Sequence, residues 1–518
     1  MATATGAAVL VEASRAAGVE VCFANPGTTE MPLVAVLDRP PGMRAVLCLF
    51  EGVCTGAADG WGRMTGRPAA TLLHLGPGLA NGIANLHNAR RARTPVVNWI
   101  GDHPTRHLPF DAPLTSDIAA LAGTVGWTRR VRSARAMGEA GLAAVNAALG
   151  PPGRVASLII PADCQWEEGS AVQSQRPAPA RPEVATETVA EAARLLRKSG
   201  VLFLGGDALG ERGLRAAARV ASATGCGVLI ETFVSRQERG RHLPDFPALP
   251  YFPDQARPAL APFNHVVLAG AREPVAFFAY PNQSSRLLAE GTLCFTLADP
   301  DTGHDASLAL EALADEVHAR AAITVLPREA TTFAPAGQAL DPDNLGRAIS
   351  AFTPDGAIVV NEAATTGMVW SAKYSPGAAP HTMLGLTGGS IGIGLPLALG
   401  AALACPDRRV IAFQADGSGL YTLQALWTLA RESANVTVVV CANRRYRVLQ
   451  TELAHVTDTP GPTARSLTEL SRPAIDWADL ARGFGVPGRR VQTDTELAEA
   501  LTRALAEPGP TLVEAVLG

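Results

Sequence analysis

The sequence predicts an α/β protein built from three doubly wound domains, each organised around a parallel sheet. Short apolar runs alternate along the chain with amphipathic or glycine-rich segments, which is typical of βαβ units. The length of 518 residues exceeds a single hydrophobic core and agrees with about three domains at roughly 150 residues each. Two irregular, proline-containing linkers at 167–185 and 327–342 separate the expected domains 1–166, 186–326 and 343–518.

The expected strands are short and rich in β-branched or apolar residues. They lie at 19–23, 45–49, 69–75 and 95–100 in the first domain, at 201–204, 266–269 and 293–297 in the second, and at 357–360, 410–413, 436–441 and 511–516 in the third. Helical spacing of apolar residues predicts helices at 6–17, 187–198 and 344–352.

Composition excludes several classes of function. A formal net charge of −4 and the absence of a basic stripe argue against a nucleic-acid partner. The apolar runs are far shorter than the roughly 20 residues that span a bilayer, and the first residues lack the pattern of a signal peptide. Eight scattered cysteines form no CxxC pair, which suits a reducing compartment. We therefore expect a cytoplasmic protein with no membrane partner.

Polar residues follow two neighbouring strands of the third domain. Asp416, Gly417 and Ser418 come directly after one expected strand, and Asn443 follows the next strand along the chain. Ligands of open parallel sheets bind at the carboxyl ends of the strands, so these residues are expected at one edge. A carboxylate and an amide oxygen suit Mg²⁺, and backbone N–H groups at a helix start suit a diphosphate.

This segment resembles the GDGS…NN motif of thiamine-diphosphate (ThDP) enzymes. The spacing of 27 residues from Asp416 to Asn443 is the spacing of that family. The resemblance implies ThDP and Mg²⁺ as cofactors, and it assigns the third protein ligand of the metal to the backbone carbonyl of Arg445. Ala415 and Ala442 depart from the motif at positions that supply no metal ligand.

Further parts of the resemblance lie elsewhere in the chain. Glu51 precedes the stretch 57–66 (AADGWGRMTG), as does the family's glutamate that activates the cofactor by sharing a proton with its aminopyrimidine. In LTGGSIGIG, Gly389 matches the residue whose carbonyl binds the 4′-amino group, and Ile391 matches the side chain that bends the cofactor into a V. Thr365 matches a second diphosphate loop.

The first domain also carries motifs of particular subfamilies. Gly76, Pro77 and Asn81 belong to a GPG-x-x-N segment, similar to that of acetolactate synthases and related decarboxylases, which we expect to form a loop near the pyrimidine. The stretch ANPGTTEMP resembles a motif of benzoylformate decarboxylase, and it places Thr28 where that enzyme holds the substrate carboxylate. His74 matches its first active-site histidine and could relay a proton, since imidazole titrates near neutrality.

The substrate candidates outside the first domain are less specific. Tyr280 lies near the place where benzoylformate decarboxylase has its second histidine, which this chain lacks. Arg447 lies beyond the expected metal loop and could bind an anionic substrate, although a solvated surface arginine is an equal alternative. Gly205-Gly206-Asp207 after a strand is weak evidence for FAD, which is a minor alternative cofactor.

Together these resemblances predict an enzyme that decarboxylates a small 2-oxo acid through a C2 ylide and an enamine. The enamine then yields an aldehyde or is joined to a second carbonyl compound. An acetolactate-synthase-like carboligase remains an alternative, and an inactive ThDP-fold partner protein is a second one. The family implies a homodimer or homotetramer, in which Glu51 and Asp416 of one active site come from different chains.

Overall fold

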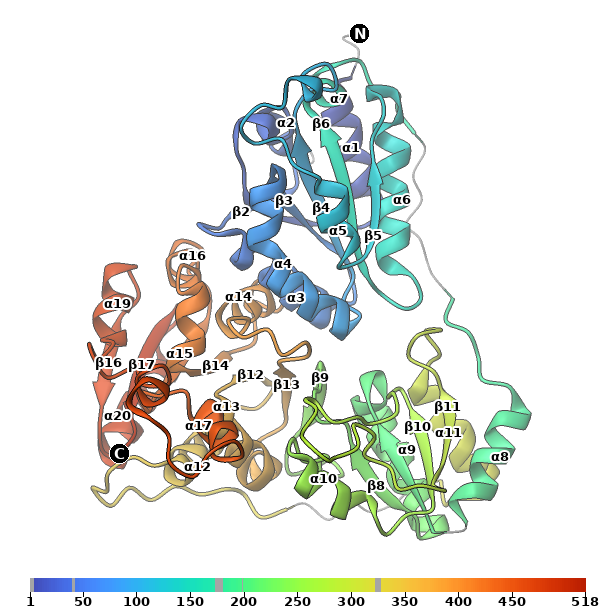
Figure 1. Cartoon of the computed structure of the whole chain (residues 1–518), viewed down its shortest axis with the longest axis vertical. Helices are drawn as coiled ribbons and strands as arrows, with labels where there is room; N and C mark the ends of the chain where they lie inside the picture. The colour runs from blue at the N-terminus through green and yellow to red at the C-terminus, as the bar shows by residue number, and fades with distance from the viewer. Residues whose placement is uncertain (1–3, 40–41, 173–179, 198, 322–327) are drawn as a thin grey trace.

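Three α/β bodies make up the molecule, which is represented by a computed structural model (Figure 1). The structure describes residues 4–39, 42–172, 180–197, 199–321 and 328–518. Within these residues the strands form three mostly parallel sheets, and the predicted fold class is confirmed. Residues 173–179 of the first expected linker, residues 322–326 at the end of the expected middle domain and residue 327 of the second linker lie outside the described residues.

The first sheet contains six described strands, all parallel, in the order β2-β1-β3-β4-β6-β5. They are β1 (Val21–Asn25), β2 (Arg44–Leu47), β3 (Ala69–His74), β4 (Val96–Asp102), β5 (Trp127–Arg130) and β6 (Val155–Pro161). Alternate residues of β1 point into two cores: Phe23 packs in the core that includes α3 (Glu51–Thr65), and Cys22 packs in the core of α1 (Gly6–Ala16). Helices therefore cover both faces, as a doubly wound sheet requires.

The middle sheet has four described parallel strands in the order β11-β10-β7-β8. They are β7 (Gly200–Leu204), β8 (Gly227–Ile230), β10 (His265–Ala269) and β11 (Leu293–Ala298). The helices around this sheet are α8 (Thr186–Leu196), α9 (Glu211–Thr224), α10 (Pro253–Leu260) and α11 (Ala306–Glu316). This body lies at the lower right of Figure 1.

The third sheet has seven described strands in the order β16-β17-β15-β14-β12-β13-β9. They are β12 (Ala357–Glu362), β13 (His381–Gly385), β14 (Val410–Ala415), β15 (Val436–Ala442), β16 (Gly488–Val491), β17 (Thr511–Val516) and β9 (Arg236–Arg239). β9 comes from the middle third of the chain and pairs antiparallel with β13. The sequence did not indicate that a strand from the middle third joins the third sheet, because β9 is polar throughout.

Two helices join the first and third bodies at very short range. α3 packs against α14 (Gly394–Ala404), and the two lie together at the centre of Figure 1. A Cβ on Gly60 would lie 2.2 Å from the carbonyl oxygen of Leu397, and one on Gly400 would lie 1.9 Å from that of Ala57. Only glycine permits this backbone approach, which accounts for Gly60 in the AADGWGRMTG stretch and for Gly400 in α14.

A buried ion pair reinforces the same contact. Arg63 donates to both carboxylate oxygens of Asp59, at 2.8 and 2.6 Å, and both side chains are almost fully buried. Arg63 also donates to the carbonyl of Gly385 at 2.6 Å and to the hydroxyl of Thr387 at 3.2 Å. The stretch after Glu51 therefore anchors the segment that leads to Gly389.

One local expectation was wrong. The GPG segment at 76–78 is not a loop: α4 (Leu75–Ala92) begins at Leu75, so Gly76 and Pro77 form its first turn. Proline is accepted there because the first N–H groups of a helix lack intrahelical partners. Among the described residues, no helix combines the length and the apolar character needed to cross a bilayer.

Candidate active site

Asp416 and Asn443 meet at the carboxyl edge of the third sheet. α15 (Asp416–Gly419) starts where β14 ends, and the parallel strand β15 ends beside it at Ala442. The Asp416 carboxylate accepts the N–H of Gly417 at 2.8 Å and that of Arg444 at 2.6 Å. One carboxylate therefore ties together the two loops that the motif predicts as the metal site.

The oxygen atoms at this edge fit as ligands of a hard divalent cation. Asp416 is 3% exposed, burial raises its pKa, and no described Lys, Arg or His side chain forms an ion pair with it. The amide oxygen of Asn443 accepts the N–H of Arg445 at 3.0 Å, and the carbonyl of Arg445 accepts that of Arg447 at 3.1 Å, so each oxygen retains a lone pair. A buried carboxylate without a cation is costly, and Mg²⁺ would offset that cost.

The expected diphosphate residues surround the same edge. Gly417 permits the close approach of Tyr446, because a Cβ there would lie 2.5 Å from the tyrosine ring. Ser418 is buried, and its hydroxyl already accepts from Gln414 at 2.7 Å. Thr365 lies in the first turn of α13 (Ala364–Val369), directly after the neighbouring strand β12, with its side chain half-buried.

A buried carboxylate that the motifs did not predict connects this edge to the start of α14. Glu362 accepts the N–H groups of Gly392 at 2.6 Å, Ile393 at 3.3 Å and Gly394 at 2.7 Å. The amide of Gln414 donates to Glu362 at 3.0 Å and also reaches Ser418. Burial raises the pKa of Glu362, and these donors oppose that shift. Glu362 thus holds the two predicted cofactor loops together through hydrogen bonds.

Replacing Glu362 with Gln is expected to weaken ThDP binding about tenfold, because a buried N–H left without an acceptor costs roughly 1–3 kcal/mol. The NH₂ group of the glutamine would also face backbone N–H groups that now donate to the carboxylate, so that two donors would oppose each other. Calorimetric titration with ThDP and Mg²⁺ measures the effect. Glu499→Gln, at an exposed position paired with Arg489, is the matched control and should leave the affinity unchanged. Equal affinities for both variants would contradict the role of Glu362 in holding the two loops together.

The segment with Gly389 and Ile391 is held by the first body. Asn88 on α4 accepts the N–H of Gly388 at 3.0 Å and donates to the carbonyl of Ser390 at 2.7 Å. Gly389 has a φ of +75°, which favours glycine, and Ile391 is half-buried. The turn at Gly389 is therefore fixed on both sides by Asn88.

An aromatic cluster from the middle body approaches Gly389. A Cβ on Gly389 would lie 2.6 Å from Cζ of Phe277. The Phe277 ring has its centroid 4.9 Å from Phe233, 5.5 Å from Tyr251 and 4.7 Å from Phe278. Phe277 and Phe278 are both exposed, so the cluster presents an apolar face beside the expected pyrimidine position.

Glu51 is the first residue of α3 and is only 6% exposed. Asn81 donates to its carboxylate at 3.0 Å, and a Cβ on Gly78 would lie 3.2 Å from the other carboxylate oxygen. The structure therefore brings together the predicted acid and the predicted GPG-x-x-N segment, with Gly76 and Pro77 in the preceding turn.

His74 ends β3 and contacts a buried acid. Its Nδ1 lies 2.8 Å from the carboxylate of Glu30, which is fully buried, and 3.3 Å from the hydroxyl of Thr29. Glu30 also accepts from Thr29 and from the N–H of Gly27. This pairing favours the tautomer with the proton on Nδ1, and no described residue bonds Nε2.

Thr28 itself is exposed, and no described hydrogen bond involves its side chain. The neighbouring Thr29 and Glu30, and not Thr28, contact His74. Leu75, directly after the histidine, has a φ of +50°, which is unusual for leucine and typical of strained backbone at functional sites.

The two remaining substrate candidates have no described hydrogen bond with the acid–histidine pair. Tyr280 donates to both carboxylate oxygens of Glu452 on α17 (Arg447–Ala454), at 3.0 Å each. Burial and this hydrogen bond raise the pKa of Tyr280. Arg447 starts α17 and is exposed, without a described side-chain partner.

The glycine turn of the middle body is already engaged. Gly206 donates its N–H to Glu231 at 3.0 Å, and a Cβ on Gly205 would lie 2.6 Å from the same carboxyl group. A carboxylate therefore occupies the position at which a flavin diphosphate would meet this turn.

Family models match both ends of the chain. Residues 4–121 match the N-terminal TPP binding domain of thiamine pyrophosphate enzymes, and residues 363–515 match the C-terminal TPP binding domain. This chain belongs to the thiamine pyrophosphate enzyme family. The two matched regions contain Glu51 and Asp416, which confirms the resemblance predicted from the motifs.

Relatives within the thiamine pyrophosphate enzymes carry two kinds of name. The chain is 47% identical, over 99% of both chains, to a Mycobacterium tuberculosis protein provisionally named acetolactate synthase large subunit IlvX. It is 31% identical to the benzoylformate decarboxylase of Pseudomonas aeruginosa over 97% of both chains. A solved ThDP-dependent 4-hydroxybenzoylformate decarboxylase of Rhodococcus jostii superimposes with a TM-score of 0.87, at 26% identity over 99% of both chains. The chain is thus a ThDP-dependent enzyme of the decarboxylase and acetolactate synthase type.

Proposed function

We propose that this enzyme uses ThDP and Mg²⁺ to decarboxylate a 2-oxo acid with an aromatic side group and releases the aldehyde. The buried contact between His74 and Glu30 carries this proposal. An imidazole held in one tautomer by a buried carboxylate can move a proton to or from a reacting carbon. The aromatic cluster around Phe277 supports an apolar, planar substrate.

The remaining residues have roles in holding the cofactor. Asp416, Asn443 and the carbonyl of Arg445 would bind the metal, while Thr365 and the start of α15 would bind the diphosphate. When bound, ThDP supplies an electron sink for the pair of electrons left by departing CO₂.

Residues on the other side of the site would position the pyrimidine. The carbonyl of Gly389 and the side chain of Ile391 would orient it, and Glu51 would share a proton with it. Thr28 is the proposed contact of the substrate carboxylate.

We further propose a homodimer as the smallest active unit. Three large apolar side chains lie exposed beside proposed cofactor residues: Leu49 near Glu51, Met368 near Thr365, and Tyr421 near Ser418. Such exposure on both halves of a site is typical of surfaces that a second copy covers.

A CO₂-release assay over pyruvate, branched-chain and aromatic 2-oxo acids tests the reaction. We expect the highest kcat/KM for an arylglyoxylate, with one aldehyde formed for each CO₂. Chelation with EDTA and gel filtration should abolish release, and ThDP with Mg²⁺ should restore it.

The same assay with pyruvate as both donor and acceptor tests the second candidate, which the acetolactate synthase name of one relative favours. Formation of an acetohydroxy acid from pyruvate would assign that function instead. No CO₂ from any acid would overturn both.

A further inference from the structure

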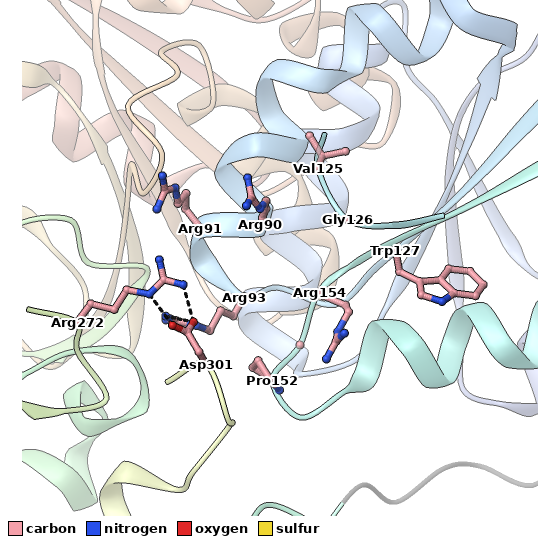
Figure 2. Close-up of a pocket in the computed structure, with 11 residues that line it drawn as sticks. Arg90, Arg91, Arg93, Val125, Gly126, Trp127, Pro152, Arg154, Arg272 and Asp301 are labelled. Atoms are coloured by element: carbon pink, nitrogen blue, oxygen red, sulfur yellow. Dashed lines mark hydrogen bonds and ion pairs between the residues drawn. The ribbon is translucent and has the colours of Figure 1, made fainter. Parts of the chain in front are cut away.

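A cationic pocket lies between the first and middle bodies, away from the proposed active-site residues. The residues that line it come from the end of α4, from the start of β6 and from the loops after β10 and β11, and Figure 2 shows Arg93 and Arg272 both reaching Asp301. Its volume is about 440 Å³. The charged residues that line it are Arg90, Arg91, Arg93, Arg154, Arg272 and Asp301.

The pocket has a large excess of positive charge. Five arginines and one aspartate line it, which leaves four positive charges in a chain whose formal net charge is −4. Asp301 is shared: Arg93 donates to it at 3.0 Å, and Arg272 donates at 2.6 and 2.8 Å. The hydrogen bond from Arg272 lowers the pKa of Asp301, so this carboxylate is ionised at neutral pH.

The remaining arginines lack an acidic partner. Arg90 donates only to the carbonyl of Thr124, at 3.4 Å. Within the described part of the chain, no carboxylate pairs with Arg91 or Arg154. Three guanidinium groups are therefore available to a ligand, around two others that Asp301 holds in place.

A second acid lies close by without neutralising the site. Glu231, close to Arg93 and Arg272, is partly buried, and the loss of solvent around its carboxyl group raises its pKa to about 7. It is therefore only partly charged near neutrality. It also points to Gly206 and not into the pocket.

We propose that this pocket binds a compact polyphosphate anion that bridges the first and middle bodies. Guanidinium groups bind phosphate oxygens in pairs of parallel hydrogen bonds, and several of them match two or three linked phosphates better than one carboxylate. The arginines come from both the first and the middle body. A bound polyphosphate would therefore stabilise the contact between these two bodies, because it binds only when they are in place. The inference does not depend on the proposed reaction.

Titration calorimetry with sodium tripolyphosphate, on enzyme loaded with ThDP and with Mg²⁺ in excess over both, tests this site. We expect saturable binding that weakens as salt rises. The double variant Arg91→Ala/Arg154→Ala should raise the Kd at least about tenfold, because two charged hydrogen-bond donors are lost. Neither side chain has a described partner, so the fold should be retained.

The matched control is Arg132→Ala/Arg135→Ala, at two exposed arginines outside the pocket, which should change the Kd by less than about twofold. ADP distinguishes the source of the phosphates: tighter binding than tripolyphosphate indicates a nucleotide, and equal binding indicates the phosphate chain alone. Absence of saturable binding, equal affinity in the pocket variant, or equal affinity for monophosphate would overturn the proposal.

Discussion

Replacing Glu51 with Gln is expected to lower kcat by about 10²–10⁴-fold, the usual effect of losing a positioned acid or base. An amide keeps the size of the side chain and the contact with Asn81 but cannot share a proton with the pyrimidine. ThDP affinity should change far less than kcat, because we propose that Asp416 and its neighbours, and not Glu51, supply the metal and diphosphate contacts. Steady-state kinetics together with ThDP titration separate the two effects.

The control for this variant is Glu12→Gln, at an exposed position of α1, which should leave kcat unchanged. Activity of Glu51→Gln within tenfold of the unmodified enzyme would contradict the proposed mechanism. Loss of ThDP binding in that variant would instead point to a structural role for Glu51.

Replacing Arg63 with Met is expected to destabilise the protein by about 3–5 kcal/mol, since the Asp59 carboxylate would be left buried without its partner. The carbonyl of Gly385 would lose its donor as well. The midpoints of thermal and urea unfolding measure this loss.

Arg67→Met is the matched control for Arg63, because its ion pair with Glu20 is about half exposed on both sides. Such surface pairs contribute roughly 0–1 kcal/mol, so this variant should unfold close to the unmodified protein. Similar unfolding midpoints for the two variants would show that the buried pair does not hold the first and third bodies together.

Local patterns predicted the fold class and most strands of the three sheets. Strand β17, for example, spans the predicted residues 511–516, and α3 begins at Glu51 as the motif implies. These elements have strong apolar periodicity or a specific motif. β9 was missed because its residues are polar and its partner β13 lies far away in sequence.

The candidate site was only partly predictable for the same reason. Glu362 acts through backbone N–H groups thirty or more residues away, which no spacing rule reveals. Phe277 reaches Gly389 from another body. The match to a subfamily motif selected Thr28, whereas the contact with His74 is made by Thr29 and Glu30. The available signal in the sequence was an acid, Glu30, directly after a Thr-Thr pair.

The glycine contacts between α3 and α14 also bear on how copies of the chain assemble. Because Gly60 and Gly400 leave no room for a side chain, the first and third bodies cannot slide past each other without a clash. In the proposed homodimer, each chain would therefore present its two half-sites as one rigid surface before it meets a second chain. Rigid partners lose little conformational entropy on docking. The rate at which two chains associate would then be limited by their encounter and relative orientation. The cofactor would bind between surfaces whose separation is already fixed within each chain.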